Sequence, residues 1–293
     1  MRIRDILDRH QPTMSFEFFP PKDDIGFWDL YKTVASLKPL EPSYVSVTYG
    51  AGGSMRRKTV ELVERIKNDI GIEAMAHLTC TGATKTELAR VLEDLKLHSI
   101  ENVLALRGDP PEGSDRFVAT EGGFTYASEL VAFIRERYDF CIGAACYPEC
   151  HPECRDPQLD LQNLKRKVDA GVDFLISQLF FDNDDFFAFR ERAEQAGIDV
   201  PIIAGIMPIL SVGQVKRFTR MCGAGIPSDL LKKIEAVEDD PEAVRHVGTH
   251  HSSEQCSKLL DSGVAGIHFY TLNRSTATRV IFQQIKSRLA VPS

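Results

Sequence analysis

The sequence of 293 residues has no long apolar run and no block of basic residues. A membrane-spanning helix needs ~18 to 20 uninterrupted apolar residues, and no segment approaches that length. The first residues, Met1 to Asp5, are charged and lack the apolar stretch of a signal peptide. The formal net charge is −7, which without a basic cluster disfavours nucleic acid as a partner. We therefore expect a cytoplasmic protein that binds neither membranes nor nucleic acid.

The sequence also lacks the Gly-x-Gly-x-x-Gly turn of an open dinucleotide-binding sheet. It has instead eight short apolar runs of strand length, at residues 15–19, 44–50, 73–80, 102–108, 140–148, 174–181, 201–208 and 266–273. Segments with helical spacing, such as 58–68 and 86–97, lie between them. This alternation predicts an α/β fold with a parallel sheet, and eight units fit one closed (β/α)8 TIM barrel. Nothing marks a domain boundary, so residues 1–293 are expected to form a single domain.

The segment Ser15-Phe16-Glu17-Phe18-Phe19-Pro20-Pro21 places one carboxylate in an aromatic strand that two prolines end. A carboxylate in an apolar wall costs several kcal/mol when ionised and unpaired, so such groups usually take up a proton near neutrality. That behaviour suits a general acid. An edge-strand glutamate that faces water fits the same residues, and both interpretations stay open at this point.

In a barrel of this kind, functional side chains lie at the carboxyl ends of the strands. The predicted strands carry an unusually polar set there: Glu17, Thr48, Tyr49, His77, Thr79, Arg107, Asp109, Tyr147, Glu149, His151, Gln178, Asp182, Tyr270, Asn273 and Arg274. Acids, arginines, an amide and aromatic rings together suit a large ligand that is partly aromatic and partly anionic.

The seven cysteines are expected to be reduced thiols, because the chain has no export signal. Cys146, Cys150, His151 and Cys154 could be drawn as a zinc site, but zinc–thiolate sites normally space their ligands more regularly. Cys146 reads as an ordinary small residue of a buried strand. We therefore expect no metal. Residues 249–251, Thr-His-His, lie in a charged stretch and are expected to form a solvated loop.

Six segments carry a more specific pattern in order along the chain: SFEFFPPK at 15–22, VTYGAGGS at 47–54, AHLTC at 76–80, LALRGDPP at 104–111, YPECHP at 147–152 and GIHFYTLNR at 266–274. Together they resemble the signatures of the methylenetetrahydrofolate reductase family. The resemblance covers essentially the whole chain and implies a (β/α)8 barrel that holds FAD. Eukaryotic members add a C-terminal half that binds S-adenosylmethionine. The resemblance is to the compact bacterial type, with residues 1–293 as the catalytic domain and no regulatory domain.

The resemblance implies a ping-pong reaction that feeds methyl groups to methionine synthesis. NADH or NADPH reduces FAD and leaves, and 5,10-methylenetetrahydrofolate then receives the hydride and becomes 5-methyltetrahydrofolate. Glu17 matches the general acid that protonates N10 and opens the ring to an iminium cation at N5. Asp109 matches a residue whose charge favours that cation. Gln178 would bind pterin and nicotinamide in turn, Thr48 would also contact substrate, and Arg274 would hold folate's glutamate carboxylate.

The family's FAD-binding positions match a larger set: Thr48, His77, Arg107, Gly108, Asp109, Tyr126, Ala127, Tyr147, His151, Asp160, Asn163, Arg166 and Lys167. Arg166 and Lys167 are expected to open the helix after the fifth strand and to meet the diphosphate. Val212 stands where many bacterial members carry a phenylalanine that stacks on substrate. Family members associate, so a homo-oligomer is expected.

Three other interpretations stay open. A flavin barrel of the proline dehydrogenase kind would share fold and cofactor, but the segment around Glu17 and the HFYTLNR ending are not its pattern. A zinc–thiolate methyltransferase barrel would use the region of Cys150. A non-catalytic folate or flavin binding protein would not need to retain both Glu17 and Asp109.

Overall fold

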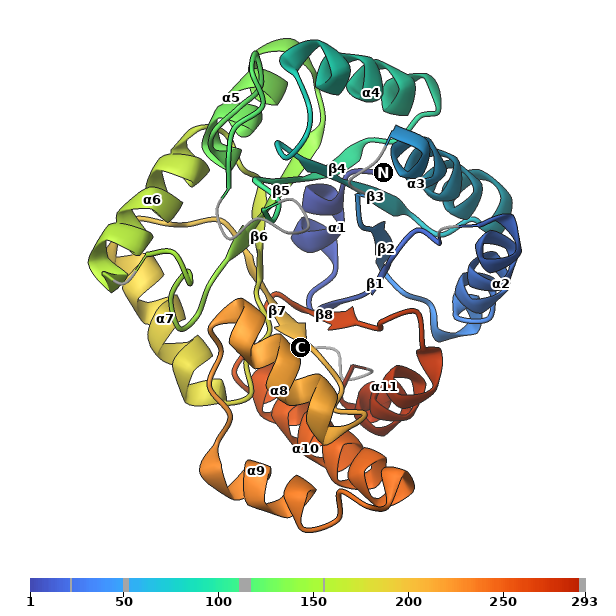
Figure 1. Cartoon of the computed structure of the whole chain (residues 1–293), viewed down its shortest axis with the longest axis vertical. Helices are drawn as coiled ribbons and strands as arrows, with labels where there is room; N and C mark the ends of the chain where they lie inside the picture. Colours follow the sequence, from blue (N-terminus) through green and yellow to red (C-terminus); the bar gives the residue numbers. More distant parts are fainter. Residues whose placement is uncertain (22, 50–52, 111–116, 155, 290–293) are drawn as a thin grey trace.

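The computed structural model describes residues 1–21, 23–49, 53–110, 117–154 and 156–289. These residues form eight strands: β1 (Thr13–Phe18), β2 (Tyr44–Val47), β3 (Ala74–Thr79), β4 (Asn102–Leu106), β5 (Cys141–Cys146), β6 (Phe174–Ser177), β7 (Ile202–Ile206) and β8 (Gly266–Tyr270). They pair in chain order, each parallel to the next, and β8 pairs with β1. The sheet therefore closes into a barrel inside a ring of helices, and the predicted single (β/α)8 TIM barrel is confirmed (Figure 1).

Each strand is followed by a helix that covers the outside of the barrel (Figure 1). These helices are α2 (Asp24–Ala35), α3 (Gly53–Arg65), α4 (Lys85–Leu97), α5 (Ala127–Arg137), α6 (Pro157–Asp169), α7 (Asn183–Gln195), α10 (Pro241–Asp261) and α11 (Ser275–Leu289). Short turns of 3₁₀- and π-helix occupy Lys38–Leu40 and Ile66–Ile70. The connection between β7 and α10 adds α8 (Val212–Cys222) and α9 (Ser228–Glu235). Buried side chains of α8, α9 and α10 pack there on residues that follow β6 and β7.

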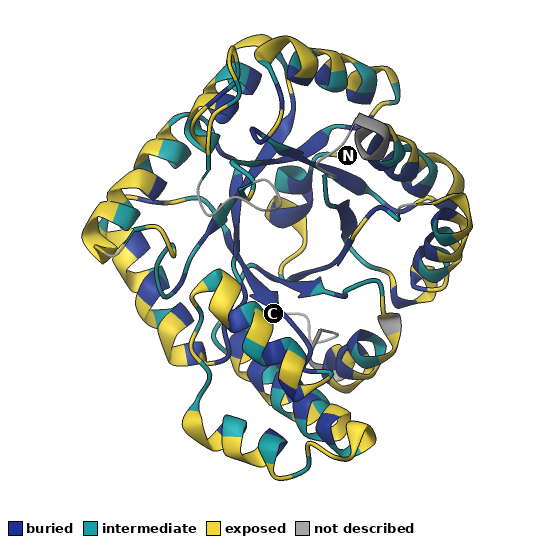
Figure 2. Ribbon diagram, in the orientation of Figure 1, coloured by how far each residue is buried: buried dark blue, intermediate teal, exposed yellow. Residues whose placement is uncertain are grey.

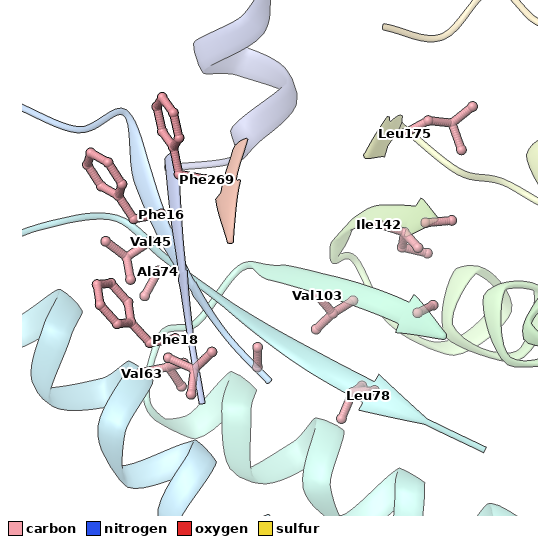
Figure 3. Packing of buried hydrophobic residues seen from close by; sticks show 14 of the residues in the cluster. Phe16, Phe18, Val45, Val63, Ala74, Leu78, Val103, Ile142, Leu175 and Phe269 are labelled. Carbon is pink, nitrogen blue, oxygen red and sulfur yellow. The ribbon is translucent and has the colours of Figure 1, made fainter. Parts of the chain in front are cut away.

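The main core lies between the strands and the surrounding helices. Met14, Phe16 and Phe18 alternate along β1 and all contribute to this outer core, where the Phe16 ring lies stacked 5.7 Å from that of Phe269 (Figure 3). The helices expose their outward faces, whereas the strands are buried on both sides (Figure 2). Because side chains alternate along a strand, Thr13, Ser15 and Glu17 point to the barrel interior.

A short helix, α1 (Ile3–Arg9), closes the amino-terminal end of the barrel. Ile3 and Leu7 of α1 pack inside the barrel against Tyr44 and Phe174, which begin β2 and β6. The Ile3 backbone N–H donates to Asn102 Oδ1 at 2.8 Å. The barrel thus has an apolar floor beneath its polar mouth.

Two sequence-based expectations about helices are wrong. Residues 249–251 lie inside α10 rather than in a loop, with His251 Nε2 3.1 Å from the Phe181 carbonyl oxygen. The solvated face of a long helix is as rich in charged and polar residues as a loop, so composition alone does not distinguish the two. Arg166 and Lys167 lie in the last turn of α6, not the first, because Asp156 caps that helix and accepts from the Gln158 N–H at 2.9 Å. No helix in the described part of the chain is long and apolar enough to cross a membrane.

Candidate active site

Glu17 lies inside the barrel near the carboxyl end of β1, with only 7% of the residue exposed. Its Oε2 atom is 3.4 Å from Nε2 of His268 on β8 and 3.5 Å from Nε2 of His77 on β3. The predicted burial is confirmed, but the predicted apolar wall is wrong. The phenyl rings of Phe16 and Phe18 point to the helices, and the carboxylate faces two imidazoles instead, because adjacent strand residues face opposite sides.

His268 is held firmly and was not selected by sequence reasoning. Its Nδ1 atom is 2.7 Å from Ser15 Oγ, and its ring stacks on Tyr44 with the centroids 6.1 Å apart. The Tyr270 ring meets it edge-on at 5.5 Å. The available signal was the two-residue period of β8, which puts His268 on the same face as Tyr270. The side chain lies beside Glu17 only because β8 pairs with β1.

His77 is also fully enclosed. The pKa of His77 is lowered to about 4, chiefly by burial, with the Glu17 carboxylate opposing the shift and the neighbouring His268 adding to it. The ring is therefore neutral at neutral pH. Its Nε2 atom makes no hydrogen bond with any described residue. A buried ring nitrogen without such a partner is suited to a ligand.

The turn after β4 carries three predicted site residues, Arg107, Gly108 and Asp109. Arg107 forms a two-pronged ion pair with Glu153, with Nη1 2.7 Å from Oε2. Gly108 has φ +87°, and a β-carbon there would lie 2.5 Å from Thr81 Oγ1. Only glycine fits this tight turn. The Asp109 side chain is exposed, and its charge adds to burial in raising the pKa of Tyr147 across the mouth.

Several predicted residues gather after β5. The Tyr147 and His151 rings meet edge-on, with centroids 4.6 Å apart, and the His151 backbone N–H donates to Asp160 Oδ2 at 3.1 Å. Lys167 reaches up from α6 and donates to the Ala145 carbonyl oxygen at 2.5 Å. Burial lowers the pKa of Lys167, because water no longer stabilises its charge. A half-buried cation beside the end of β5 favours an anionic ligand.

The other predicted residues are more dispersed. Thr48 follows β2 and donates its backbone N–H to the Phe18 carbonyl oxygen at 2.9 Å. Gln178 follows β6, is half-buried, and accepts the Leu179 N–H on Oε1 at 2.9 Å. Arg274 is exposed just after β8. These side chains end three strands of the same barrel, so they share its mouth.

The remaining predicted residues lie at the start of α5 or on α6 rather than at strand ends. Tyr126 is 61% exposed and Ala127 begins α5. Asn163 and Arg166 are exposed on α6, where Arg166 Nη1 donates to Asn163 Oδ1 at 3.1 Å. A surface groove of about 600 Å³ beside them is lined by Gln158, Leu161, Gln162, Lys165, Arg166 and Ala196. Parts of three predicted motifs lie outside the described residues: residue 22 of SFEFFPPK, residues 50–52 of VTYGAGGS, and residue 111 of LALRGDPP together with the following 112–116.

The cysteine cluster does not form a metal site in the structure. Cys146 is buried in β5, whereas the Cys150 thiol donates to the Cys154 carbonyl oxygen at 2.6 Å. Within the described ranges, no three His, Cys, Asp or Glu side chains are arranged to hold a metal ion. All seven cysteines are free thiols.

The fold is a (β/α)8 barrel that encloses a carboxylate and two imidazoles near the carboxyl ends of its strands. The family model for methylenetetrahydrofolate reductase matches residues 2–286, and the chain belongs to that family.

The relatives are of two lengths. 5,10-Methylenetetrahydrofolate reductase of Escherichia coli is 41% identical over 271 residues, which cover 92% of this chain and 90% of that protein. Methylenetetrahydrofolate reductase (NADH) 1 of Arabidopsis thaliana is 41% identical over 93% of this chain, but over only 48% of its own length. Methylenetetrahydrofolate reductase 2 of Saccharomyces cerevisiae is 39% identical over 97% of this chain and 50% of its own length. The chain therefore spans about half the length of its plant and fungal relatives.

Among solved structures, a Clostridium thermocellum protein that binds two copies of 5-methyl-5,6,7,8-tetrahydrofolic acid has a TM-score of 0.65. The match covers 98% of each chain at 15% identity. Dihydropteroate synthase from Xanthomonas albilineans has a TM-score of 0.54 at 13% identity, covering 98% of this chain and 95% of that one. At these identities the likeness shows the fold alone.

Proposed function

We propose that this chain reduces 5,10-methylenetetrahydrofolate to 5-methyltetrahydrofolate with NADH or NADPH in a ping-pong sequence, using FAD as its cofactor. The observation that carries the proposal is Glu17, buried between His77 and His268 beneath the mouth of a barrel of this family. The product would supply methyl groups for methionine synthesis.

The residues present fit FAD. The Nε2 atom of His77 is buried without a hydrogen-bond partner among the described residues, and the half-buried Lys167 supplies a cation for a phosphate. Bound there, FAD would supply the hydride-transfer chemistry between nicotinamide and folate. We assign its binding to Thr48, His77, Arg107, Gly108, Asp109, Tyr126, Ala127, Tyr147, His151, Asp160, Asn163, Arg166 and Lys167.

Glu17 is the proposed general acid. The closed ring of the substrate cannot accept a hydride until N10 is protonated and the ring opens to an iminium cation at N5. The His77 ring, which is neutral at neutral pH, flanks this carboxyl group with its Nε2 atom 3.5 Å from Oε2. His268, fixed by Ser15, holds the carboxyl group in place. General acid catalysis of this kind accelerates a reaction roughly 10²–10⁴-fold.

The remaining substrate contacts follow from side-chain chemistry. Asp109 is exposed at the mouth, where its charge favours the cationic iminium. The Gln178 amide has an acceptor and two donors, which suit a pterin edge and a carboxamide in turn. Thr48 lies nearby at the end of β2, and the exposed guanidinium of Arg274 can hold the glutamate carboxylate of folate.

The test is to purify the protein, add FAD and remove the excess. We expect a yellow protein with an oxidised-flavin spectrum, NAD(P)H–menadione activity and NAD(P)H-dependent formation of 5-methyltetrahydrofolate. A preparation that stays colourless after FAD is added, or that binds FAD without either activity, contradicts the proposal. Metal analysis on the same sample tests the methyltransferase alternative, since stoichiometric zinc without a flavin spectrum would favour it.

A further inference from the structure

The loop between β5 and α6 holds two cysteines in one turn. The Cys154 N–H donates to the His151 carbonyl oxygen at 2.8 Å, and this bond closes the turn. The Cys150 thiol donates to the Cys154 carbonyl oxygen at 2.6 Å, so its sulfur already contacts the residue that carries the second sulfur. The turn therefore holds the two cysteines next to each other.

These two thiols differ from most of the others in the chain. Both are half-buried, whereas Cys80, Cys141, Cys146 and Cys256 are buried in the core. Cys222 is also half-buried, but it ends α8, on a different element. Cys150 and Cys154 are thus both reachable by a small reagent and adjacent to each other.

The turn is coupled to the candidate site through the residues between the cysteines. Glu153 forms the two-pronged ion pair with Arg107, and His151 packs edge-on against Tyr147. The two S–H groups themselves brace the loop, because Cys150 donates to the Cys154 carbonyl and Cys154 donates to the Asp156 carbonyl at 3.4 Å. Oxidation removes both donors, so the turn that presents Glu153 must rearrange.

We propose that Cys150 and Cys154 form a reversible disulfide and that this oxidation weakens binding of FAD. The effect on FAD rests on the proposed function, whereas the disulfide does not. The co-reactant is a low-molecular-weight disulfide such as oxidised glutathione.

The exchange takes two steps. The Cys154 thiolate attacks one glutathione sulfur, the glutathione S–S bond breaks, and one glutathione leaves as a thiolate. The Cys150 thiolate then attacks the Cys154 sulfur, the mixed disulfide breaks, and the second glutathione leaves. The two leaving thiolates take up the two protons that the cysteines gave up, so two cysteines are oxidised and one glutathione disulfide is reduced. Cys154 reacts first because burial and Asp160 raise the pKa of the Cys150 thiol.

The test uses the purified full chain, first reduced, then equilibrated with oxidised glutathione. Peptide mass spectrometry should show a loss of two hydrogens and a fragment pattern that places the link between Cys150 and Cys154. The dissociation constant for FAD, followed by flavin fluorescence, should rise about tenfold, as expected when the loop loses the hydrogen bonds of its two S–H groups. Reduction with dithiothreitol should restore the original dissociation constant.

Matched variants sharpen the outcome. Cys154→Ser and Cys150→Ser should form no internal link and keep the FAD affinity of the reduced protein, whereas Cys222→Ser should respond like the wild type. A link to any other cysteine, no link, or equal FAD affinity of the linked and reduced forms overturns the proposal. Failure of the reduced protein to bind FAD would count against the proposed function, and the mass measurement would still decide on the disulfide.

Discussion

Replacing Glu17 by glutamine separates the role of a proton donor from that of a structural side chain. The amide has nearly the same shape and can still meet the His268 nitrogen at 3.4 Å and the His77 nitrogen at 3.5 Å. It cannot give a proton to N10. Because glutamine fills nearly the same volume and opens no cavity, we expect the variant to fold and to retain bound FAD.

The loss should fall on one half-reaction. Folate reduction should drop roughly 10²–10⁴-fold, which corresponds to about 3–5 kcal/mol of transition-state stabilisation. NAD(P)H–menadione activity needs no proton from Glu17 and should stay within about twofold of the wild type. Glu17→Asp keeps a carboxyl group on a side chain that is one methylene shorter. Its folate activity should therefore lie between those of the wild type and Glu17→Gln.

The assays are stopped-flow measurements of each half-reaction on the same preparations. Glu73→Gln provides the control, because this half-buried glutamate pairs with Lys67 at 3.0 Å and precedes β3 at the amino-terminal end of the barrel, away from the mouth. It should leave both half-reactions unchanged. Equal losses in both half-reactions of Glu17→Gln would refute the reasoning and make Glu17 a structural residue.

Three further predictions concern other parts of the site. The unfolded chain binds a proton on His77 near pH 6.5 but the folded protein only near pH 4, so stability falls as the pH is lowered through this window. The unfolding free energy should drop by about 3 kcal/mol more in the wild type than in His77→Gln between pH 7 and pH 4, and parallel denaturation curves would contradict this. Gly108→Ala should destabilise the protein by about 2 kcal/mol more than Gly122→Ala and weaken FAD binding, because both have positive φ but only position 108 meets Thr81. Equal melting temperatures of Gly108→Ala and Gly122→Ala would contradict this prediction. Arg274→Ala should raise the KM for folate about tenfold and spare menadione reduction, and an unchanged KM would show that Arg274 does not bind folate.

The barrel could be predicted because strands buried on both faces read as continuous apolar runs. The ends of those runs were less certain. The sixth run extends to Phe181, but β6 ends at Ser177 and the following Leu179 and Phe181 pack against α8 and α9 instead of the sheet. Apolar residues look alike in sequence whether a strand or a satellite core buries them.

The site was partly predictable for a related reason. Residues at strand ends, such as Glu17 and His77, share a mouth as soon as the barrel is assumed. The partnership of Glu17 with His268 joins the first strand to the last and depends on closure of the sheet, which no local pattern reports. The positions of Arg166 and Lys167 were also not predictable, because they depend on where α6 begins and therefore on which turn of the helix each residue occupies.

The helix that plugs the amino-terminal end of the barrel has a kinetic consequence. With Ile3 and Leu7 filling that end, there is no through-passage along the barrel axis in the described part of the chain. A nicotinamide donor and a folate would then have to enter and leave through the same mouth of the barrel. Where the two bind at overlapping positions, one has to dissociate before the other can bind, and the reaction alternates without a moving gate.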